Sequence, residues 1–295
     1  MKHVYTIDNL RDRSLPENAK LAVLGYPVAH SASPEMHQAA LDALGLDVTY
    51  IRLEIEPGSV AESFSLMQKI GFIGCNVTIP HKLEAMECCD TLSDSVRLLG
   101  VANTIHFHEG KIMGDNSDGP GLVKALEEDL KLRVKGARVL VLGAGGGAGK
   151  AIATQLNSEG CARLYLSNRT VSKAELLVEK FIENTASDQT RLKALGNSVS
   201  DLKMIADDVD IIINATSQGM KPEDELPFPV ESITSEHKVY DAIYSPPCTK
   251  LLESASDRGA AISNGLSMLV HQGAISFEIW TGVAPDTKLM REAIS

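Results

Sequence analysis

The stretch LVLGAGGGAGKA, residues 140–151, decides the fold of this chain. It completes an apolar run that starts at Ala137, and it leads through a glycine-rich turn at Gly143 into a helical pattern. A buried strand, such a turn and a helix in this order are typical of a dinucleotide-binding site, where free N–H groups of the helix bind the pyrophosphate. Gly143 permits the tight turn, Gly145 the close approach of a phosphate, and Ala148 the close packing of helix on strand. An ordinary tight turn between a strand and a helix is the alternative.

The end of the next expected strand, residues 162–167, indicates which dinucleotide is bound. Sites that prefer NAD usually have Asp or Glu there, which accepts a hydrogen bond from the ribose 2′-hydroxyl. This chain has Asn168 and Arg169 instead, followed by Thr170 and Lys173. A guanidinium can pair with a 2′-phosphate and lie over the adenine ring, which a carboxylate cannot do. We therefore expect NADP(H), and the alternative is a solvated arginine at the start of a helix.

Apolar runs alternate with helical patterns along the whole chain, which predicts α/β architecture with parallel sheets. Strands are expected at 20–25 (the first), 48–55, 74–79, 137–142, 162–167, 209–215 and 239–243, with a hairpin over 102–113. Helices are expected at 34–44, 59–70, 83–89, 93–99, 122–130, 173–183 and 268–280. Gly, Asn, Asp and Pro gather at 115–120, where we place a domain boundary. The helix after Gly265 fits either domain.

The composition suits two globular domains. The 295 residues exceed the usual size of one domain, and 44% of them are hydrophobic. The net charge of −11 disfavours nucleic-acid and anionic-membrane partners, because both need a basic surface. The chain has no apolar run of about eighteen residues and no signal-peptide core at its start, so we expect a cytoplasmic protein. Its cysteines are odd in number and lack paired CxxC spacing, so neither disulfides nor a metal site are expected; they are Cys75, Cys88, Cys89, Cys161 and Cys248.

Four motifs place polar side chains together in the first half of the chain. They are HSASP at 30–34, NVTIPHK at 76–82, ANT at 102–104 and GDNSDG at 114–119. The first two follow expected strands, and ligands of open α/β sheets bind beyond the carboxyl ends of the strands. Hydroxyls, an amide, an amine and a carboxylate at that edge would suit a small polyhydroxylated carboxylic acid.

Each motif also has a structural interpretation. Ser33 can cap the helix that begins near Pro34, and Asp118 can cap the helix that contains Leu122. Thr78 can be an ordinary strand residue, and Asn103 an ordinary turn residue. The motifs point to a ligand site because they occur together.

In this order, HSxSP, NVTxPxK, ANT, GDNxDG, GAGG and NRT resemble the shikimate dehydrogenase family, from Leu21 to about Glu292. The resemblance implies a substrate domain over residues 1–117, to which helices of 266–295 return, and a Rossmann-like NADP-binding domain over 118–265. It also implies the reversible NADPH-dependent reduction of 3-dehydroshikimate to shikimate, in chorismate and aromatic amino acid biosynthesis. The implied partner is this small molecule, and a monomer or a homodimer fits equally well.

The resemblance further implies roles for individual residues. Ser31 and Ser33 would hold the substrate carboxylate, with Tyr244 near it. The groups around the ring hydroxyls would be Thr78, Lys82, Asn103, Asp118 and Gln272. The cofactor contacts would be Gly143, Ala144, Gly145, Gly146, Gly147, Asn168, Arg169, Thr170 and Lys173, with Ala242 and Gly265 nearer the nicotinamide. Ala32 and His81 depart from the residues frequent in the family, but neither removes a functional group named here.

Lys82 and Asp118 are the motif-borne pair suited to acid–base catalysis, because reduction of a ketone needs a proton donor at the carbonyl oxygen. A nearby carboxylate favours the ammonium form of lysine, which would stabilise the developing alkoxide and pass on a proton. Which of the two carries the proton in each step stays open, because such a pair titrates as a unit. His81 is expected to point away from Lys82 and is a minor alternative.

Three other functions stay open. A quinate/shikimate dehydrogenase with broader substrate or NAD tolerance is one, although the intact Ser31 and Ser33 favour shikimate. A non-catalytic regulator that binds a metabolite and a nucleotide is another, although the Lys82–Asp118 pair argues against it. A glutamyl-tRNA reductase-like domain would share only the nucleotide half, and it would usually carry a catalytic cysteine.

Overall fold

The structure is a computed structural model that describes residues 3–184 and 190–295. The chain divides into two compact units, Met1–Gly121 with Val270–Ser295, and Leu122–Leu269. The boundaries expected after residues 117 and 265 lie a few residues earlier in each case. Both units are α/β, which confirms the predicted fold class. Within the described ranges, none of the helices combines the length and the hydropathy that a membrane span requires.

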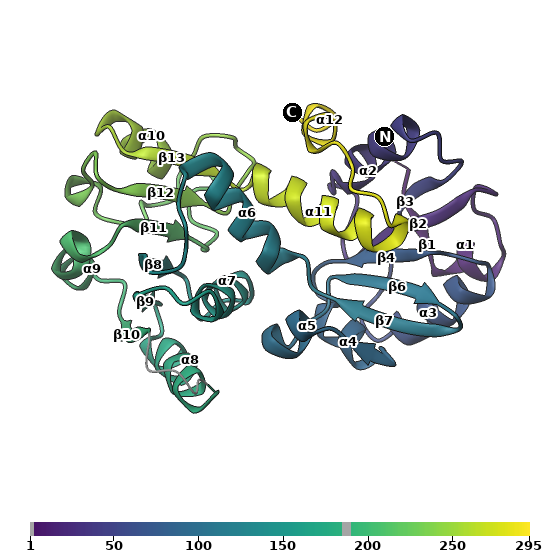
Figure 1. Ribbon diagram of the computed structural model, residues 1–295, viewed down its shortest axis with the longest axis horizontal. Helices are drawn as coiled ribbons and strands as arrows, with labels where there is room; N and C mark the ends of the chain where they lie inside the picture. Colours follow the sequence, from purple (N-terminus) through teal and green to yellow (C-terminus); the bar gives the residue numbers. More distant parts are fainter. Residues whose placement is uncertain (1–2, 185–189) are drawn as a thin grey trace. The chain divides into compact units, whose positions relative to one another are not determined.

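The described part of the first unit holds a mixed seven-stranded sheet (Figure 1). In spatial order its strands are β1 (Tyr5–Thr6), β3 (Thr49–Glu54), β2 (Ala19–Gly25), β4 (Gly74–Val77), β6 (Thr104–His108), β7 (Lys111–Asp115) and β5 (Thr91–Leu92). The first four are parallel, β6 runs antiparallel to β4, and β7 runs antiparallel to β6. The carboxyl ends of β2, β4 and β7 therefore share one edge of the sheet with the amino end of β6.

Side chains alternate along the strands and enter a separate core on each face of this sheet. On β2, Leu21 and Val23 pack into one core, while Ala22 and Leu24 pack into the other. The first core is completed by α2 (Ser33–Ala43), α12 (Thr287–Glu292) and the part of α11 (Leu266–Thr281) in this unit. The second core is completed by α1 (Ile7–Arg11), α3 (Val60–Lys69), α4 (Lys82–Glu87) and α5 (Asp94–Leu99).

The segment before β2 contains two elements that the sequence interpretation missed, because it placed the first strand at residue 20. Tyr5 and Thr6 of β1 pair in parallel with β3. Leu10 of α1 is buried in the core, and the Arg11 guanidinium donates to Glu62 of α3, with Nε 2.9 Å from Oε1. A two-residue strand and a five-residue helix are too short to give a periodic pattern.

The second unit is a parallel sheet flanked by helices. Its described strands are, in spatial order, β10 (Arg191–Leu195), β9 (Arg163–Ser167), β8 (Arg138–Leu142), β11 (Ile211–Asn214), β12 (Lys238–Asp241) and β13 (Ala261–Asn264). The helices are α6 (Asp118–Leu130, which starts in the first unit), α7 (Gly147–Ser158), α8 (Val171–Asn184), α9 (Val199–Ile205) and α10 (Lys250–Asp257). In chain order the strands are arranged 3-2-1-4-5-6, the doubly wound order of dinucleotide-binding folds, whose ligands bind outside the carboxyl ends of the central strands. The sequence interpretation missed β10, α9, α10 and β13.

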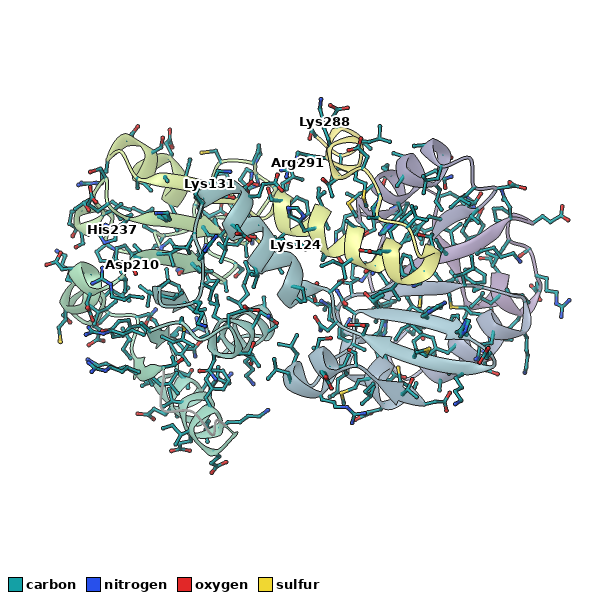
Figure 2. The ribbon with its side chains drawn as sticks, in the orientation of Figure 1. Lys124, Lys131, Asp210, His237, Lys288 and Arg291 are labelled. Carbon is teal, nitrogen blue, oxygen red and sulfur yellow. The ribbon has the colours of Figure 1, made fainter. Side chains whose placement is uncertain are left out.

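Polar anchors hold the opposite, amino edge of this sheet. Asp210 and His237 directly precede β11 and β12 (Figure 2). The Asp210 carboxylate accepts hydrogen bonds from the backbone N–H and Nε of Arg138, at 2.7 and 3.0 Å. His237 Nε2 lies 3.0 Å from the carbonyl oxygen of Ala206. These groups are occupied in fixing the strands.

Candidate active site

Lys82 and Asp118 form an ion pair in the first unit, with Nζ 2.5 Å from Oδ2. Each is the first residue of a helix that starts beyond a strand: α4 follows β4, and α6 follows β7. Their side chains are 29% and 18% exposed, so both can reach a bound molecule. The Asp118 carboxylate accepts no backbone N–H from a described residue, so it does not act as a helix cap.

Ser31 and Ser33 lie in the connection from β2 to α2, at the same edge. The N–H of Ser33 donates to Ser31 Oγ at 3.3 Å, and the N–H of Ser31 donates to the Val28 carbonyl at 3.0 Å. Ala32 is the N-cap residue of α2 and Ser33 its first residue, so the capping interpretation of Ser33 is wrong. Ser33 is only 6% exposed, and its hydroxyl makes no hydrogen bond within the described ranges. It is therefore available to a ligand.

Asn103 is held rigidly at the start of β6. Its Oδ1 accepts from the Ser117 N–H at 2.8 Å and from the Thr104 hydroxyl at 2.9 Å, and its Nδ2 donates to Ser117 Oγ at 3.0 Å. The amide oxygen is occupied, so the N–H that remains on Nδ2 is the group that can reach a substrate hydroxyl. Asn103 is thus more than a turn residue.

A buried polar network behind Asn103 was not singled out from the sequence. Thr104 Oγ1 lies 2.7 Å from Ser276 Oγ of α11, and Ser276 accepts from Asn76 Nδ2 at 2.9 Å. The Tyr50 hydroxyl donates to Asn76 Oδ1 at 2.8 Å. These groups are scattered along the sequence and have no spacing that predicts their contact. Together they orient Asn103 and attach α11 to the sheet.

Gln272 and Thr78 complete the predicted substrate set in this unit. Gln272 is 8% exposed, and its Oε1 accepts from the Ser117 hydroxyl at 3.5 Å. Thr78 lies one residue beyond β4, and its methyl group lies 2.5 Å from the position that a Cβ on Gly25 would take. The Thr78 hydroxyl makes no hydrogen bond in the described part of the chain. The direction of β4 brings Thr78 to the edge that holds Lys82 and Asp118, whereas Gln272 is supplied by α11.

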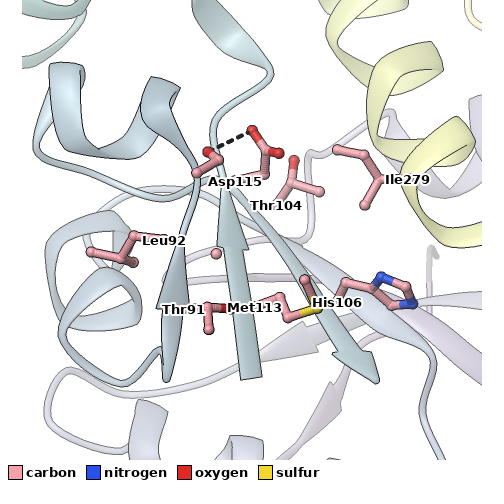
Figure 3. Close-up of a pocket in the computed structure, with 9 residues that line it drawn as sticks. Thr91, Leu92, Thr104, His106, Met113, Asp115 and Ile279 are labelled. Atoms are coloured by element: carbon pink, nitrogen blue, oxygen red, sulfur yellow. Dashed lines mark hydrogen bonds between the residues drawn. The ribbon is translucent and has the colours of Figure 1, made fainter. Parts of the chain in front are cut away.

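Two other polar residues of these motifs have structural roles. Asp115 Oδ1 accepts from the hydroxyls of Ser93 and Ser95, at 3.1 and 2.8 Å, at the start of α5. Figure 3 shows it on the wall of a small hollow of about 200 Å³ that Thr104 and Ile279 also line. His81 is 1% exposed, and its Nε2 lies 2.7 Å from the Ile55 carbonyl oxygen. His81 therefore has a structural role, which disfavours it as the proton donor in catalysis.

A cavity of about 400 Å³ opens at the carboxyl edge of the second sheet. It lies where β8 and β11 end, at the topological switch point of the doubly wound order. Seven of the predicted cofactor residues line it: Gly143, Gly145, Gly146, Asn168, Arg169, Thr170 and Lys173. Asn197 and residues 215–218 also line it and were missed, because no spacing rule connects them to the glycine loop.

The glycine loop matches its motif except at one position. Gly143 has a φ of +78°, and a Cβ there would lie 2.7 Å from the Thr216 methyl group. The residue that lets α7 pack closely is Gly149, whose Cβ would lie 2.1 Å from the Gly143 carbonyl oxygen, whereas Ala148 is exposed. The assignment of close packing to Ala148 is therefore wrong by one residue.

Several loop N–H groups are already bonded. Those of Gly143 and Ala144 donate to the Ser167 carbonyl, and that of Gly145 donates to Asn168 Oδ1. The N–H of Gly147, the first residue of α7, has no partner among the described residues, and it can bind an anion together with the positive end of the helix dipole.

The side chains that follow β9 divide into two groups. The side-chain amide of Asn168 is fully engaged within the protein: its Oδ1 accepts from the Gly145 N–H, and its Nδ2 donates to the Thr170 carbonyl. Arg169 and Lys173 are exposed, and their side chains make no ion pair or hydrogen bond within the described ranges. Two uncompensated cations on the wall of one cavity fit a polyanionic ligand such as NADP.

Ala242, Gly265 and Tyr244 lie elsewhere in the second unit. A Cβ on Gly265 would lie 2.2 Å from the Ala242 carbonyl oxygen, so only glycine lets the backbones at positions 265 and 242 lie this close together. Tyr244 is 38% exposed in the segment after β12. Asp241, three residues before Tyr244, is buried, and burial raises the pKa of its carboxyl. Hydrogen bonds from Thr249, Ile243 and Asn214 act in the opposite direction but are outweighed. Asp241 ties three segments together at this edge.

A lysine–aspartate ion pair in one α/β unit, and a cavity beside the glycine loop of a Rossmann-like unit with Arg169 and Lys173 on its wall, are typical of a nicotinamide-nucleotide-dependent oxidoreductase. Residues 23–105 match the family described as "Shikimate dehydrogenase substrate binding domain", 125–221 match "Shikimate / quinate 5-dehydrogenase", and 265–294 match "Shikimate 5'-dehydrogenase C-terminal domain". A shikimate dehydrogenase (NADP(+)) of Methanopyrus kandleri is 38% identical over 281 residues, which are 94% of this chain and 95% of the relative. The chain belongs to the shikimate dehydrogenase family, which confirms the resemblance.

Two further proteins show how completely the chain matches. A shikimate dehydrogenase (NADP(+)) of Geobacillus kaustophilus is 40% identical and covers 92% of this chain and 96% of its own. The crystal structure of shikimate 5-dehydrogenase from Thermus thermophilus in complex with NADP(H) and shikimate has a TM-score of 0.81 at 34% identity. That match covers 94% of this chain and 98% of the other.

Proposed function

We propose that the chain catalyses the reversible, NADPH-dependent reduction of 3-dehydroshikimate to shikimate, a step on the route to chorismate and the aromatic amino acids. The Lys82–Asp118 contact of 2.5 Å is the observation that carries the proposal. It joins an amine and a carboxylate at an edge of the sheet where the other polar side chains are hydroxyls and amides. The relatives named shikimate dehydrogenase (NADP(+)) match this chain over more than nine tenths of its length.

The first unit supplies substrate recognition and the proton. Ser31 and Ser33 hold the carboxylate, because two hydroxyls at the start of α2 can both donate to it. Thr78, the free N–H of Asn103, and Gln272 contact the ring hydroxyls. Lys82 donates a proton to the carbonyl oxygen during reduction, and Asp118 orients its ammonium group. In the reverse direction the pair accepts the proton from the alcohol.

The second unit holds NADP(H), which when bound supplies or accepts the hydride. The N–H of Gly147 and the start of α7 bind its pyrophosphate. Arg169, with Thr170 and Lys173, binds the 2′-phosphate, and the absence of a carboxylate at this strand end favours NADP over NAD. The family resemblance implies that Ala242 and Gly265 serve the nicotinamide end of the cofactor and that Tyr244 serves the substrate carboxylate.

The test follows the NADPH absorbance band with purified protein, using shikimate or quinate as substrate and NADP or NAD as cofactor. We expect turnover with shikimate and NADP, and at least tenfold lower kcat/KM with quinate or with NAD. Comparable values for both acids would instead establish a broader quinate/shikimate dehydrogenase. Tight binding of shikimate and NADP without turnover would establish a regulator. The cytoplasmic location and the monomeric or homodimeric state stay predictions for cell fractionation and light scattering.

A further inference from the structure

Arg52 is a buried cation that no motif accounts for. It lies on β3, where Ile51 and Leu53 pack into one core and Tyr50 packs into the other, on the side of α2. Alternation along the strand therefore directs Arg52 to the face that α2 covers. Its side chain is 7% exposed. A buried arginine costs free energy unless every donor that it removes from water finds a partner.

Arg52 finds its partners on both sides of Ser33. Its Nε and Nη2 donate to the Ser31 carbonyl oxygen, at 3.1 and 2.7 Å. Its Nη2 also lies 2.5 Å from Oε2 of Glu35, in the first turn of α2. One planar guanidinium thus joins the residue two positions before Ser33 to the residue two positions after it. It fixes the backbone from which both serine hydroxyls extend.

Stability alone does not explain such a group. A buried ion pair can often be replaced by apolar side chains without loss of stability, so its presence is weak evidence of a stabilising role. Its partners, however, include the backbone of the serine turn, which itself has few bonds. Besides the local Ser31–Val28 bond, the turn is held by the 3.3 Å contact of Ser33 N–H with Ser31 Oγ. The Met36 N–H also donates to the Ala32 carbonyl at 3.2 Å, and the Val28 N–H donates to Glu54 Oε2 at 3.1 Å. Arg52 ties the Ser31 end of this turn to β3, and Glu54 of the same strand ties the Val28 end.

We propose that Arg52 is a positioning residue that fixes the direction of the Ser31 and Ser33 hydroxyls, and so determines selection of a carboxylate-bearing substrate. The inference rests on the proposed function. Arg52 acts through the serine turn and does not itself touch the substrate. Glu35 neutralises its charge and holds it in place, so selectivity comes from the fixed hydroxyls and not from a free positive charge.

The test compares Arg52→Met, Arg52→Lys and Glu35→Gln with wild type, using shikimate and shikimate methyl ester. Hydrogen bonds to a charged group are worth roughly 1.5–3 kcal/mol, so Arg52→Met should raise the KM for shikimate by about tenfold or more. The KM for NADP should be unchanged, and kcat should stay within about threefold. The methyl ester carries no negative charge, so the preference for shikimate over the ester should fall.

Two graded variants separate positioning from general damage. Arg52→Lys keeps a donor for the Ser31 carbonyl but cannot also bridge to Glu35, so it should rescue part of the loss. Glu35→Gln keeps a side-chain oxygen that can accept from Arg52 and removes a negative charge, so Arg52 should stay on Ser31 and the KM for shikimate should not rise. If Arg52→Met does not fold, Arg52→Lys carries the comparison. Arg11→Met is the matched control, because it removes another Arg–Glu pair of the same unit, distant in sequence from the serine turn.

The outcomes that overturn the inference are specific. An unchanged KM for shikimate in Arg52→Met would show that the serine turn needs no support. An equal loss for the acid and the ester, or a loss equal to that of Arg11→Met, would show a purely structural role. These results all require a wild type that oxidises shikimate. A wild type without that activity would contradict the proposed function itself, and calorimetric binding of shikimate to the same variants would still test Arg52.

Discussion

The Nζ of Lys82 and the Oδ2 of Asp118 lie 2.5 Å apart, although 36 residues separate them in the chain. Both residues begin helices, so neither side chain is covered by a preceding helical turn. The start of the 13-residue helix α6 places its positive dipole end at Asp118. We expect this pair to deliver the proton to the carbonyl oxygen through Lys82.

Replacing Lys82 tests this role. We expect Lys82→Ala to lower kcat by roughly 10²–10⁴-fold, which is the usual contribution of a general acid or base. NADPH binding, measured by its fluorescence, should stay near that of wild type, because Lys82 and the nucleotide cavity belong to different units. A variant that keeps more than about a third of wild-type turnover would show that Lys82 does not carry the proton.

The two serines should affect binding more than turnover. Ser31→Ala and Ser33→Ala each remove a hydroxyl whose bond to the carboxylate is present in ground and transition states alike. The KM for shikimate should rise by about tenfold or more, on the basis of roughly 1.5–3 kcal/mol per bond, with kcat less affected. Steady-state kinetics at saturating NADP measures both constants. A large fall in kcat at constant KM would place the serines at the reacting carbon instead.

Cofactor preference should depend on Arg169. Its guanidinium is exposed and unpaired in the described structure, so a 2′-phosphate would gain a charge-assisted contact that NAD cannot make. Arg169→Ala should lower the kcat/KM ratio of NADP over NAD by about 10–150-fold, and nearer tenfold if Lys173 compensates. Arg191→Ala, at the opposite, amino end of the adjacent strand β10, is the control. A ratio within about twofold of wild type would make Arg169 an ordinary surface arginine.

The corrected packing residue of the glycine loop predicts a contrast between neighbours. In Gly149→Ala the new methyl group would meet a backbone oxygen at 2.1 Å, which cannot move aside without shifting the loop. Overpacking of this kind costs about 1–3 kcal/mol, more than the gain of about 1 kcal/mol in helix propensity. Gly147→Ala meets nothing within 4 Å and should show no loss of stability. Thermal unfolding of the two variants decides, and equal Tm values would contradict the assignment.

Stability should fall in mild acid because of His37. Burial lowers the pKa of His37 from 6.5 to about 3, against a smaller opposing effect of Asn76, and neither ring nitrogen has a hydrogen-bond partner within the described structure. The ring stacks on Tyr50, with centroids 4.5 Å apart. The unfolded chain therefore binds a proton that the folded chain does not, from pH 6.5 down to about 3, and stability decreases over that interval.

The size of this effect can be measured against a non-titrating variant. Between pH 7 and pH 5 the loss attributable to His37 is about 2 kcal/mol, at about 1.4 kcal/mol per pH unit. His37→Gln should reduce the pH dependence of urea unfolding by that amount, while the carboxylates contribute equally to both proteins. Parallel stability curves for wild type and variant would mean that folding does not lower the pKa of His37.

The sequence predicts the parts of the site that lie in short, ordered motifs. The central strand β8 and its glycine loop, and the polar groups after β2 and β4, follow from local pattern alone. The register of α7 does not, because glycine occupies so many neighbouring positions that several helix starts are possible. This ambiguity explains why the sequence prediction assigned the close helix packing to Ala148 and not to Gly149.

Long-range contacts account for what the sequence did not predict. Ser276 meets Thr104 and Asn76 through α11, and Arg52 lies in an otherwise apolar run whose pattern shows only a strand. Their importance comes from partners that are distant in the sequence. Edge elements such as β10 were missed for a different reason, since half-exposed strands lack a continuous apolar run.

The two residues of β1 have a consequence for how the protein behaves in a crowded solution. A bare edge of a parallel sheet presents unpaired N–H and C=O groups to any other extended chain, and it invites aggregation. Tyr5 and Thr6 occupy that edge on β3, and the Arg11–Glu62 pair fastens α1 beside them. The N-terminal segment, which carries no catalytic motif, thus covers the Leu53–Glu54 end of this edge, and we expect a protein trimmed back to β2 to lose Leu10 from its core and to aggregate more readily.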